Sequence, residues 1–138
     1  MARTGAVRLY RGLSKQFNPN EVGERQQSGM TGTNFTDCPY AALLYARGTK
    51  GTVLVLDVTP EELARARPRG IRVTKELWSL DGSGPRRYMI WGRFEGILTA
   101  GIPATKLRAE IRRKGVRAQP GEVKSRILKR FIEDYIHD

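Results

Sequence analysis

The stretch that decides the fold is residues 32–58, which read GTNFTDCPYAALLYARGTKGTVLVLDV. Residues 33–36 carry β-branched or aromatic side chains at alternate places, which is typical of a short, half-buried strand. Residues 53–56 (VLVL) are apolar on both faces, as expected of a central strand. The stretch therefore predicts a strand, a helix and a second strand in close succession.

The helix of this unit is predicted by the residues between the two strands. Asp37 is placed to cap free backbone amides, and Pro39 has the fixed φ angle that suits a first helical turn. Ala41, Leu44 and Tyr45 then fall on one helical face, and two glycines just beyond them mark the end of the helix. We therefore expect the ring of Tyr45 beside a strand end, where it would form the wall of a site for a flat ligand.

The elements predicted outward from this unit are short strands and a few helices. Strands are expected at residues 6–10 (ended by Gly12), 70–75, 87–91 and 94–99, and helices at residues 57–67, 104–114 and 122–136. Residues 14–30 are polar and rich in turn residues, so we expect a long loop there. Strands and helices do not alternate strictly, which favours an α+β fold. Residues 1–104 would form the main body, and residues 105–138 a basic helical extension packed on the same domain.

The composition is strongly basic, with 25 Lys and Arg against 14 Asp and Glu in 138 residues, a net charge of +11. Residues 105–138 hold ten basic and five acidic residues, so this quarter of the chain carries +5. A surplus of this size implies attraction to phosphate-rich or acidic partners.

The cysteine and histidine content excludes several kinds of site. Cys38 is the single cysteine, so an internal disulfide is excluded. A catalytic thiol would need a paired histidine, and the only histidine is the penultimate residue, His137. No Cys/His cluster has metal-ligand spacing, so we expect no metal.

The hydropathy of the chain bears on its location. No apolar run approaches the roughly 18 residues of a membrane span, and Met1 is not followed by a signal-peptide pattern. We expect a soluble chain with no membrane partner, either cytoplasmic or delivered into the cytoplasm of a target cell.

Three short motifs follow one another in an order that indicates chemistry. They are Tyr10-Arg11-Gly12, the run from Thr36 to Tyr45 (TDCPYAALLY) and the run from Glu95 to Pro103 (EGILTAGIP). In this order the chain resembles the ADP-ribosyltransferase superfamily over residues 6–107. Members carry Tyr-(Arg or His)-Gly on the first strand, and a Ser/Thr-rich strand that leads into a helix. A Glu then opens a late strand, often followed by Gly-Ile-Pro.

The resemblance implies a fold of split mixed β-sheets with a few helices, and NAD as a co-substrate. Transfer from NAD breaks the ribose–nicotinamide bond and develops positive oxocarbenium character on the ribose. Glu95 is the candidate carboxylate that stabilises this charge and binds the 2-hydroxyl group. Arg11 is the candidate donor fork for the pyrophosphate and ribose.

Five further residues are candidates for binding NAD. The ring of Tyr45 would stack on the nicotinamide, with Tyr40 or Phe35 as alternatives. The amide of Gly12 would bind the carboxamide group, because glycine allows a ligand to approach the backbone closely. The hydroxyl group of Thr36 would orient Glu95 or the ribose.

Each candidate also has a purely structural interpretation. Arg11 could be one surface charge among 25, and Tyr45 could belong to the core. Thr36 could be an ordinary strand residue, and Glu95 a solvated acid at a strand edge.

Two departures from the family pattern bear on the acceptor. Members that modify arginine usually have a second acid two residues before the Glu, where this chain has Arg93. Arginine modification is therefore disfavoured, and a basic group at this place fits a phosphate-bearing acceptor. In the second departure, Phe35-Thr36-Asp37 replaces the serine-rich triplet of many toxins. The pattern of the helix is similar to that of the diphtheria-toxin-like branch. That branch has His where this chain has Arg11.

Basic residues gather around the proposed site and along the next helix. Those singled out as a nucleic-acid surface are Arg86, Arg87, Arg93, Arg112, Arg113 and Lys114, with Lys106, Arg108 and Arg117 nearby. They could equally be solvated helix faces. Enzymes that act on nucleic acid carry such surfaces to neutralise phosphates.

The leading hypothesis is an NAD-dependent ADP-ribosyltransferase that modifies RNA or DNA, in the manner of a toxin or effector domain. Three alternatives stay open. The acceptor could be an acidic protein. The enzyme could be an NAD-dependent RNA 2′-phosphotransferase, which relies on Arg and His and needs no Glu. The fold could also be a nucleic-acid-binding module without catalysis.

Overall fold

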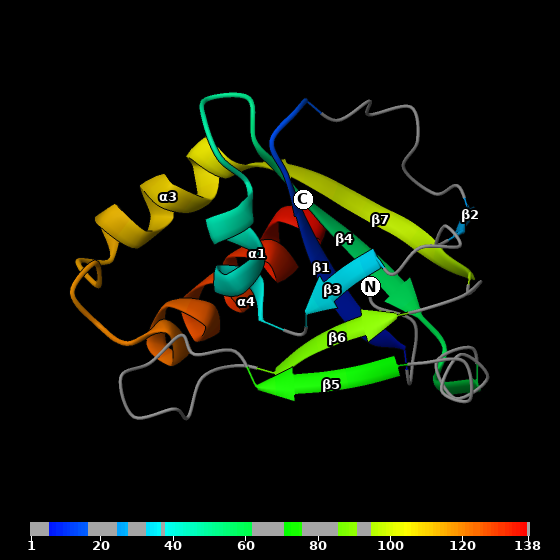
Figure 1. Cartoon of the computed structure of the whole chain (residues 1–138). Coiled ribbons are helices and arrows are strands. Elements are labelled where there is room, and N and C mark those ends of the chain that lie inside the picture. Colours follow the sequence, from blue (N-terminus) through cyan, green and yellow to red (C-terminus); the bar gives the residue numbers. More distant parts are fainter. Residues whose placement is uncertain are drawn as a thin grey trace.

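The computed structural model describes residues 6–16, 25–27, 33–36, 38–61, 71–75, 86–90 and 95–137 (Figure 1). For residues 25–27, 33–36, 71–75, 86–90, 95 and 96 it describes the backbone alone. Strands and helices do not alternate regularly in these ranges, so the predicted α+β class is confirmed. None of the helices in these ranges combines the length and apolarity that a membrane crossing needs.

The strands form one seven-stranded sheet in the order β2-β7-β4-β1-β3-β6-β5. Their bounds are Val7–Leu13 for β1, Arg25–Gln27 for β2, Thr33–Thr36 for β3, Thr52–Val58 for β4, Ile71–Lys75 for β5, Arg86–Ile90 for β6 and Glu95–Pro103 for β7. The predicted strands at 33–36, 53–56, 70–75, 87–91 and 94–99 are thus confirmed, although β7 runs further than expected. Within the predicted loop 14–30, β2 adds a short strand.

Every strand pair among the described residues is antiparallel, so the expectation of mixed sheets is wrong. Parallel neighbours need long crossover connections, whereas antiparallel neighbours do not. The described strands also form one sheet, so the expectation of split sheets is wrong too. One join in this sheet is narrow, and we call it the seam. Among the described residues, Tyr10 and Thr36 form the one pair between β1 and β3, whereas β1 and β4 pair along their full length. The seam divides the sheet into β2-β7-β4-β1 and β3-β6-β5.

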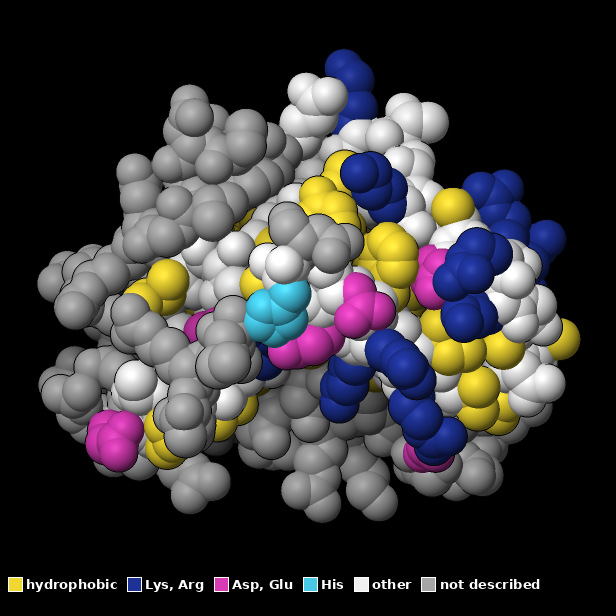
Figure 2. Space-filling model, turned by 180° about the vertical axis from the view of Figure 1, so that it is seen from behind, with side chains coloured by type: hydrophobic (Ala, Val, Ile, Leu, Met, Phe, Trp, Pro, Cys, Tyr) yellow, Lys and Arg dark blue, Asp and Glu magenta, His cyan; other side chains and the backbone are white. Residues whose placement is uncertain are grey.

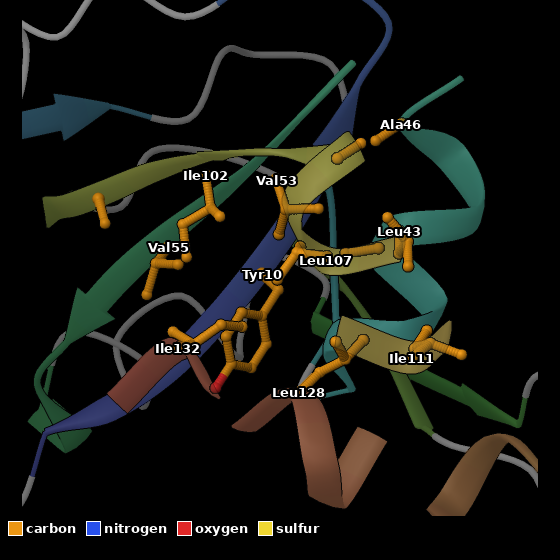
Figure 3. Close-up of a cluster of buried hydrophobic side chains, with 13 residues drawn as sticks. Tyr10, Leu43, Ala46, Val53, Val55, Ile102, Leu107, Ile111, Leu128 and Ile132 are labelled. Carbon is orange, nitrogen blue, oxygen red and sulfur yellow. The ribbon is translucent and has the colours of Figure 1, made fainter. Parts of the chain in front are cut away.

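Three helices pack on one face of the sheet (Figure 1). They are α1 (Pro39–Tyr45), α3 (Ala104–Arg113) and α4 (Gly121–His137), close to the predicted ranges. Figure 3 shows Val53, Val55 and Ile102 of the sheet meeting Leu107 of α3 and Ile132 of α4. We call this side of the sheet the helical face.

The opposite face of the sheet also carries fully buried side chains. Leu9, Leu56 and Leu98 lie in register on β1, β4 and β7, and their exposed fractions are 0%, 3% and 1%. β4 is buried on both faces, with Val53 and Val55 in the helical core and Leu56 on the opposite face, which explains its continuously apolar sequence. The predicted central strand is confirmed.

Helix α1 is oriented differently from its predicted orientation. Leu44 and Tyr45 are 43% and 44% exposed, while Ala41, Ala42 and Leu43 are buried. The helix has only seven residues, so its docking decides its buried side more than its periodicity does. Pro39 lies in the first turn as expected, but the N-cap is Cys38, and the expected cap Asp37 lies outside the described residues.

The docking of α1 depends on Gly12. A Cβ atom added at Gly12 would overlap the carbonyl oxygen of Ala42 and lie 2.9 Å from the amide nitrogen of Ala46. Only glycine allows this approach of helix backbone to strand backbone. The strand also continues through Gly12 to Leu13, so the expectation that it ends at Gly12 is wrong.

Helix α4 belongs to the core. Leu128 and Ile132 are fully buried, and Phe131, Tyr135 and Ile136 pack around them. Ser125 fixes the helix to α1, because its hydroxyl oxygen accepts a hydrogen bond from the Tyr40 amide (3.2 Å). The helix predicted at residues 122–136 is confirmed.

Candidate functional site

Arg11 is a cation without a counter-ion among the described residues. It lies on β1 opposite Leu54, and its side chain is exposed. Partial desolvation lowers the pKa of its guanidinium, and no charged group of the described chain acts against that shift. Because arginine remains charged in any case, the lowered pKa marks a cation that a bound anion would stabilise.

The seam brings the first two sequence motifs together. Tyr10, next to Arg11, pairs with Thr36 at the end of β3. On its other side, Thr36 pairs with Arg87 of β6, and Phe35 pairs with Tyr88. The backbone of Arg87 therefore lies two strands from Tyr10, about 10 Å across the sheet.

Glu95 opens β7, as expected, but the register does not place it beside Arg11. Its backbone pairs with Gln27 of β2. Along β4, Ile97 is paired with Asp57 and Arg11 with Leu54, so Glu95 is five residues and two strands from Arg11. This corresponds to about 16 Å along the strands and about 10 Å across them.

Tyr45 and Arg11 lie on opposite sides of the sheet. Side chains alternate along a strand, and both neighbours of Arg11 face the helices: Tyr10 packs in the helical core and Gly12 meets α1. Arg11 therefore faces away from α1, whose last residue is Tyr45. Tyr40 also lies on the helical face, so the structure does not bring the predicted aromatic wall next to Arg11.

The contact with α1 also explains Gly12 without a ligand. The backbone of Ala42 occupies the space beside Gly12 on the helical face, where we expected the carboxamide of NAD to approach. Close packing of the helix is sufficient to require glycine there. Its predicted ligand role therefore loses its steric support.

A hydrogen-bonded network on the helical face was missed by the sequence analysis. Arg8 donates from Nε to Oδ1 of Asp57 (2.9 Å) and from a terminal nitrogen to Oε2 of Glu133 (2.6 Å). Thr99 also donates to Oδ2 of Asp57 (2.8 Å). The network joins β1, β4, β7 and α4. One available sequence signal was Asp57, a carboxylate at the end of an otherwise apolar strand.

The network has one exposed end, where His137 contacts Glu133 at 2.9 Å (Figure 2). This hydrogen bond is the largest cause that lowers the pKa of Glu133, followed among the lowering causes by the charge of Arg8. The hydrogen bond to Asp57 raises the pKa of Arg8. Each charge in this network is therefore balanced by a neighbour.

A groove of about 630 Å³ lies between α1, α3 and the start of α4, and we call it the α1–α3 groove. Its lining residues are Tyr40, Leu43, Leu44, Arg47, Thr105, Arg108, Ile111, Arg112, Arg117 and Lys124. Five of them are basic and none is acidic. Figure 2 shows Lys and Arg side chains gathered on the side of α3 and α4, with hydrophobic side chains between them.

The predicted nucleic-acid residues are separated in the structure. Arg112 lines the α1–α3 groove, whereas Arg113 is bound by both carboxylate oxygens of Glu110 (2.8 and 3.0 Å). Lys114 follows α3 as its exposed C-cap. Arg86 and Arg87 belong to β6, in the other part of the sheet, and Arg93 lies outside the described residues.

A second cleft, of about 620 Å³, lies beside the end of β7 and includes Lys50, Thr99 and Tyr135. Among the residues whose side chains are described, neither Arg11 nor Tyr45 lines either cleft. Within the described ranges, no group of three His, Cys, Asp or Glu side chains is arranged to hold a metal ion.

Comparison of the chain with protein-family models, with curated proteins and with solved structures finds no match.

Proposed function

We propose that this protein is an NAD-dependent ADP-ribosyltransferase whose acceptor is a nucleic acid. The observation that carries the proposal is Arg11, a partly desolvated guanidinium beside the seam that no carboxylate of the described residues neutralises. The order of the three motifs supports it, since the pair Tyr10–Thr36 brings the first two into adjacent strands.

The chemistry assigns different parts of the co-substrate to different residues. Arg11 supplies a fork of donors for the pyrophosphate, which carries the negative charge. Glu95 stabilises the positive charge that develops on the ribose as the bond to nicotinamide breaks. A nucleophile of the acceptor then bonds to the ribose carbon, and nicotinamide leaves.

Nicotinamide release and adduct formation test the proposal together. The protein is incubated with NAD and with RNA, single-stranded DNA or a cell lysate, and products are identified by mass spectrometry. We expect an ADP-ribose adduct on nucleic acid that disappears in Glu95→Gln and Arg11→Ala. Arg126→Ala, which removes an exposed cation of α4, serves as the matched control and should retain activity. Absence of nicotinamide release with every acceptor would disprove the proposal.

The separation of Glu95 from Arg11 favours one second candidate. An RNA 2′-phosphotransferase-like enzyme also uses NAD and does not depend on a glutamate. Removal of a 2′-phosphate from RNA, retained in Glu95→Ala and lost in Arg11→Ala, would select this candidate over the first.

A further inference from the structure

The α1–α3 groove collects positive charge from separate parts of the chain. Arg47 follows α1, Arg112 lies on α3, Arg117 lies between α3 and α4, and Lys124 lies on α4. Like charges that converge on one groove repel each other and focus a positive potential there. A bound polyanion would relieve this repulsion.

Two of the cations are held in place by their neighbours. The ammonium group of Lys124 donates to the hydroxyl oxygen of Tyr40 (3.2 Å) and lies 4.6 Å from the centre of its ring. Arg108 donates to the backbone carbonyl oxygens of Ala46 and Gly48, at the C-terminal end of α1. The partners are neutral groups, so both side chains stay positively charged. Because the contacts already restrict the two side chains, less conformational entropy is lost when a ligand binds.

Three guanidinium groups remain free for a ligand. Arg47, Arg112 and Arg117 are exposed, and no residue in the described ranges forms an ion pair or hydrogen bond with their guanidinium groups. The neighbouring Arg113 is neutralised by Glu110 and does not line the groove. Of the two adjacent arginines at the end of α3, Arg112 is therefore the one that supplies charge to the groove.

The groove also offers apolar and planar surface. Leu44 is 43% exposed, and Tyr40 is partly exposed at the same groove. Guanidinium planes bind phosphate in a bidentate manner and stack on nucleobases, so a groove rich in arginine suits both parts of a nucleotide. A volume of about 630 Å³ accommodates a short extended strand, whereas a duplex would contact only its rim.

We propose that the α1–α3 groove binds single-stranded nucleic acid. Phosphates lie against Arg47, Arg112, Arg117 and Lys124, and bases lie against Leu44 and the guanidinium planes. The groove is on the helical face, and Arg11 points away from that face. The site is therefore separate from the proposed NAD site and requires no transferase activity.

Fluorescence anisotropy tests the proposal with the full chain and a labelled single-stranded RNA of roughly 12 nucleotides. The double variant Arg112→Ala/Arg117→Ala should weaken binding by about tenfold or more. The slope of log affinity against log salt should fall by about 1.4, because two phosphate contacts are lost. Circular dichroism of the variant checks that its fold is retained.

The matched control is Arg126→Ala/Lys129→Ala, which removes the same charge from exposed positions of α4 outside the groove. It should weaken binding by less than about threefold. If the control and the groove variant weaken binding equally, the binding is diffuse and the proposal is overturned. It is also overturned if polyglutamate competes as well as RNA at equal charge, or if the duplex of the same sequence binds as tightly.

A second measurement separates this inference from the proposed enzyme. Hydrolysis of NAD by water, without an acceptor, should be unchanged in Arg112→Ala/Arg117→Ala and lost in Arg11→Ala. Binding of RNA by a protein that never releases nicotinamide would uphold the groove and reject the transferase.

Discussion

Two arginines three residues apart on β1 have opposite environments. Arg8 faces the helices, its side chain is 13% exposed, and it contacts the carboxylates of Asp57 and Glu133. Arg11 faces the other side, is exposed, and has no counter-ion among the described residues. Hydrogen bonding to Asp57 raises the pKa of the first, and desolvation lowers that of the second. The charge of Arg8 is balanced within the fold, whereas that of Arg11 is balanced by no carboxylate among the described residues.

The largest effect should come from removing the partner of Arg8. In Asp57→Ala the arginine stays largely buried without its bidentate carboxylate, and Thr99 loses its acceptor. We expect a loss of about 3 kcal/mol in the free energy of unfolding, measured by urea titration. A loss below about 1 kcal/mol would show that the ion pair of Arg8 contributes little to stability, so that Arg8 and Arg11 differ less in this respect than their contacts indicate.

A smaller loss is expected from Gly12→Ala, on the same side of β1 as Arg8. The added methyl group must displace the backbone of Ala42, so α1 has to move away from the strand. We expect a loss of about 2 kcal/mol in the free energy of unfolding. Ser14→Ala removes an exposed hydroxyl group nearby and provides the reference, with an effect below about 0.5 kcal/mol. Equal effects of the two substitutions would contradict close packing at Gly12.

Protonation of Glu133 should weaken the Arg8 network in acid. Hydrogen bonding to His137 and the charge of Arg8 lower its pKa in the folded state, so its contribution is complete above the unfolded value of about 4.3. It is lost as the pH falls through the lower folded value. The side chain is 47% exposed, so solvent screening limits the contribution to about 0.5 kcal/mol. Urea titrations of wild type and Glu133→Gln at a series of pH values should converge in acid; a constant difference would refute this linkage.

The smallest effect on stability should come from Arg11→Met. The substitution keeps an aliphatic stem and removes a cation that has no counter-ion among the described residues, so the free energy of unfolding should change by less than about 0.5 kcal/mol or rise slightly. NAD binding, followed by calorimetric titration, should nevertheless be lost. A large destabilisation would mean that Arg11 serves the fold as Arg8 does.

The elements that the sequence predicted well are those governed by local physics. β4 is continuously apolar because it is buried on both faces, and β3, β5 and β6 have the composition of strands. Pro39 marks the start of α1, and the stripe around Leu128 and Ile132 marks the buried side of α4. Each of these signals is contained within one short window of sequence.

The candidate site was predicted less well because it depends on strand order and facing. The distance between Arg11 and Glu95 along the sequence does not predict their positions in the sheet. There they are separated by two strands and by five residues along the strands. The periodicity of a seven-residue helix did not reveal which side of α1 would be buried. The backbone of Ala42 packs on Gly12, and Tyr45 is exposed. The antiparallel pairing was not predicted for the same reason, because long-range packing determines which strands are neighbours in a sheet.

By itself, the sequence determined the α+β class, most of the helices and strands, and the large positive charge, because composition and periodicity are local properties. Only the tertiary structure decided which charges are neutralised. It paired Arg8 with Asp57 across 49 residues, and among the described residues it left Arg11 and the α1–α3 groove without a carboxylate. The physical reason is that a charge is balanced by what lies within a few ångströms, and that distance is set by the fold.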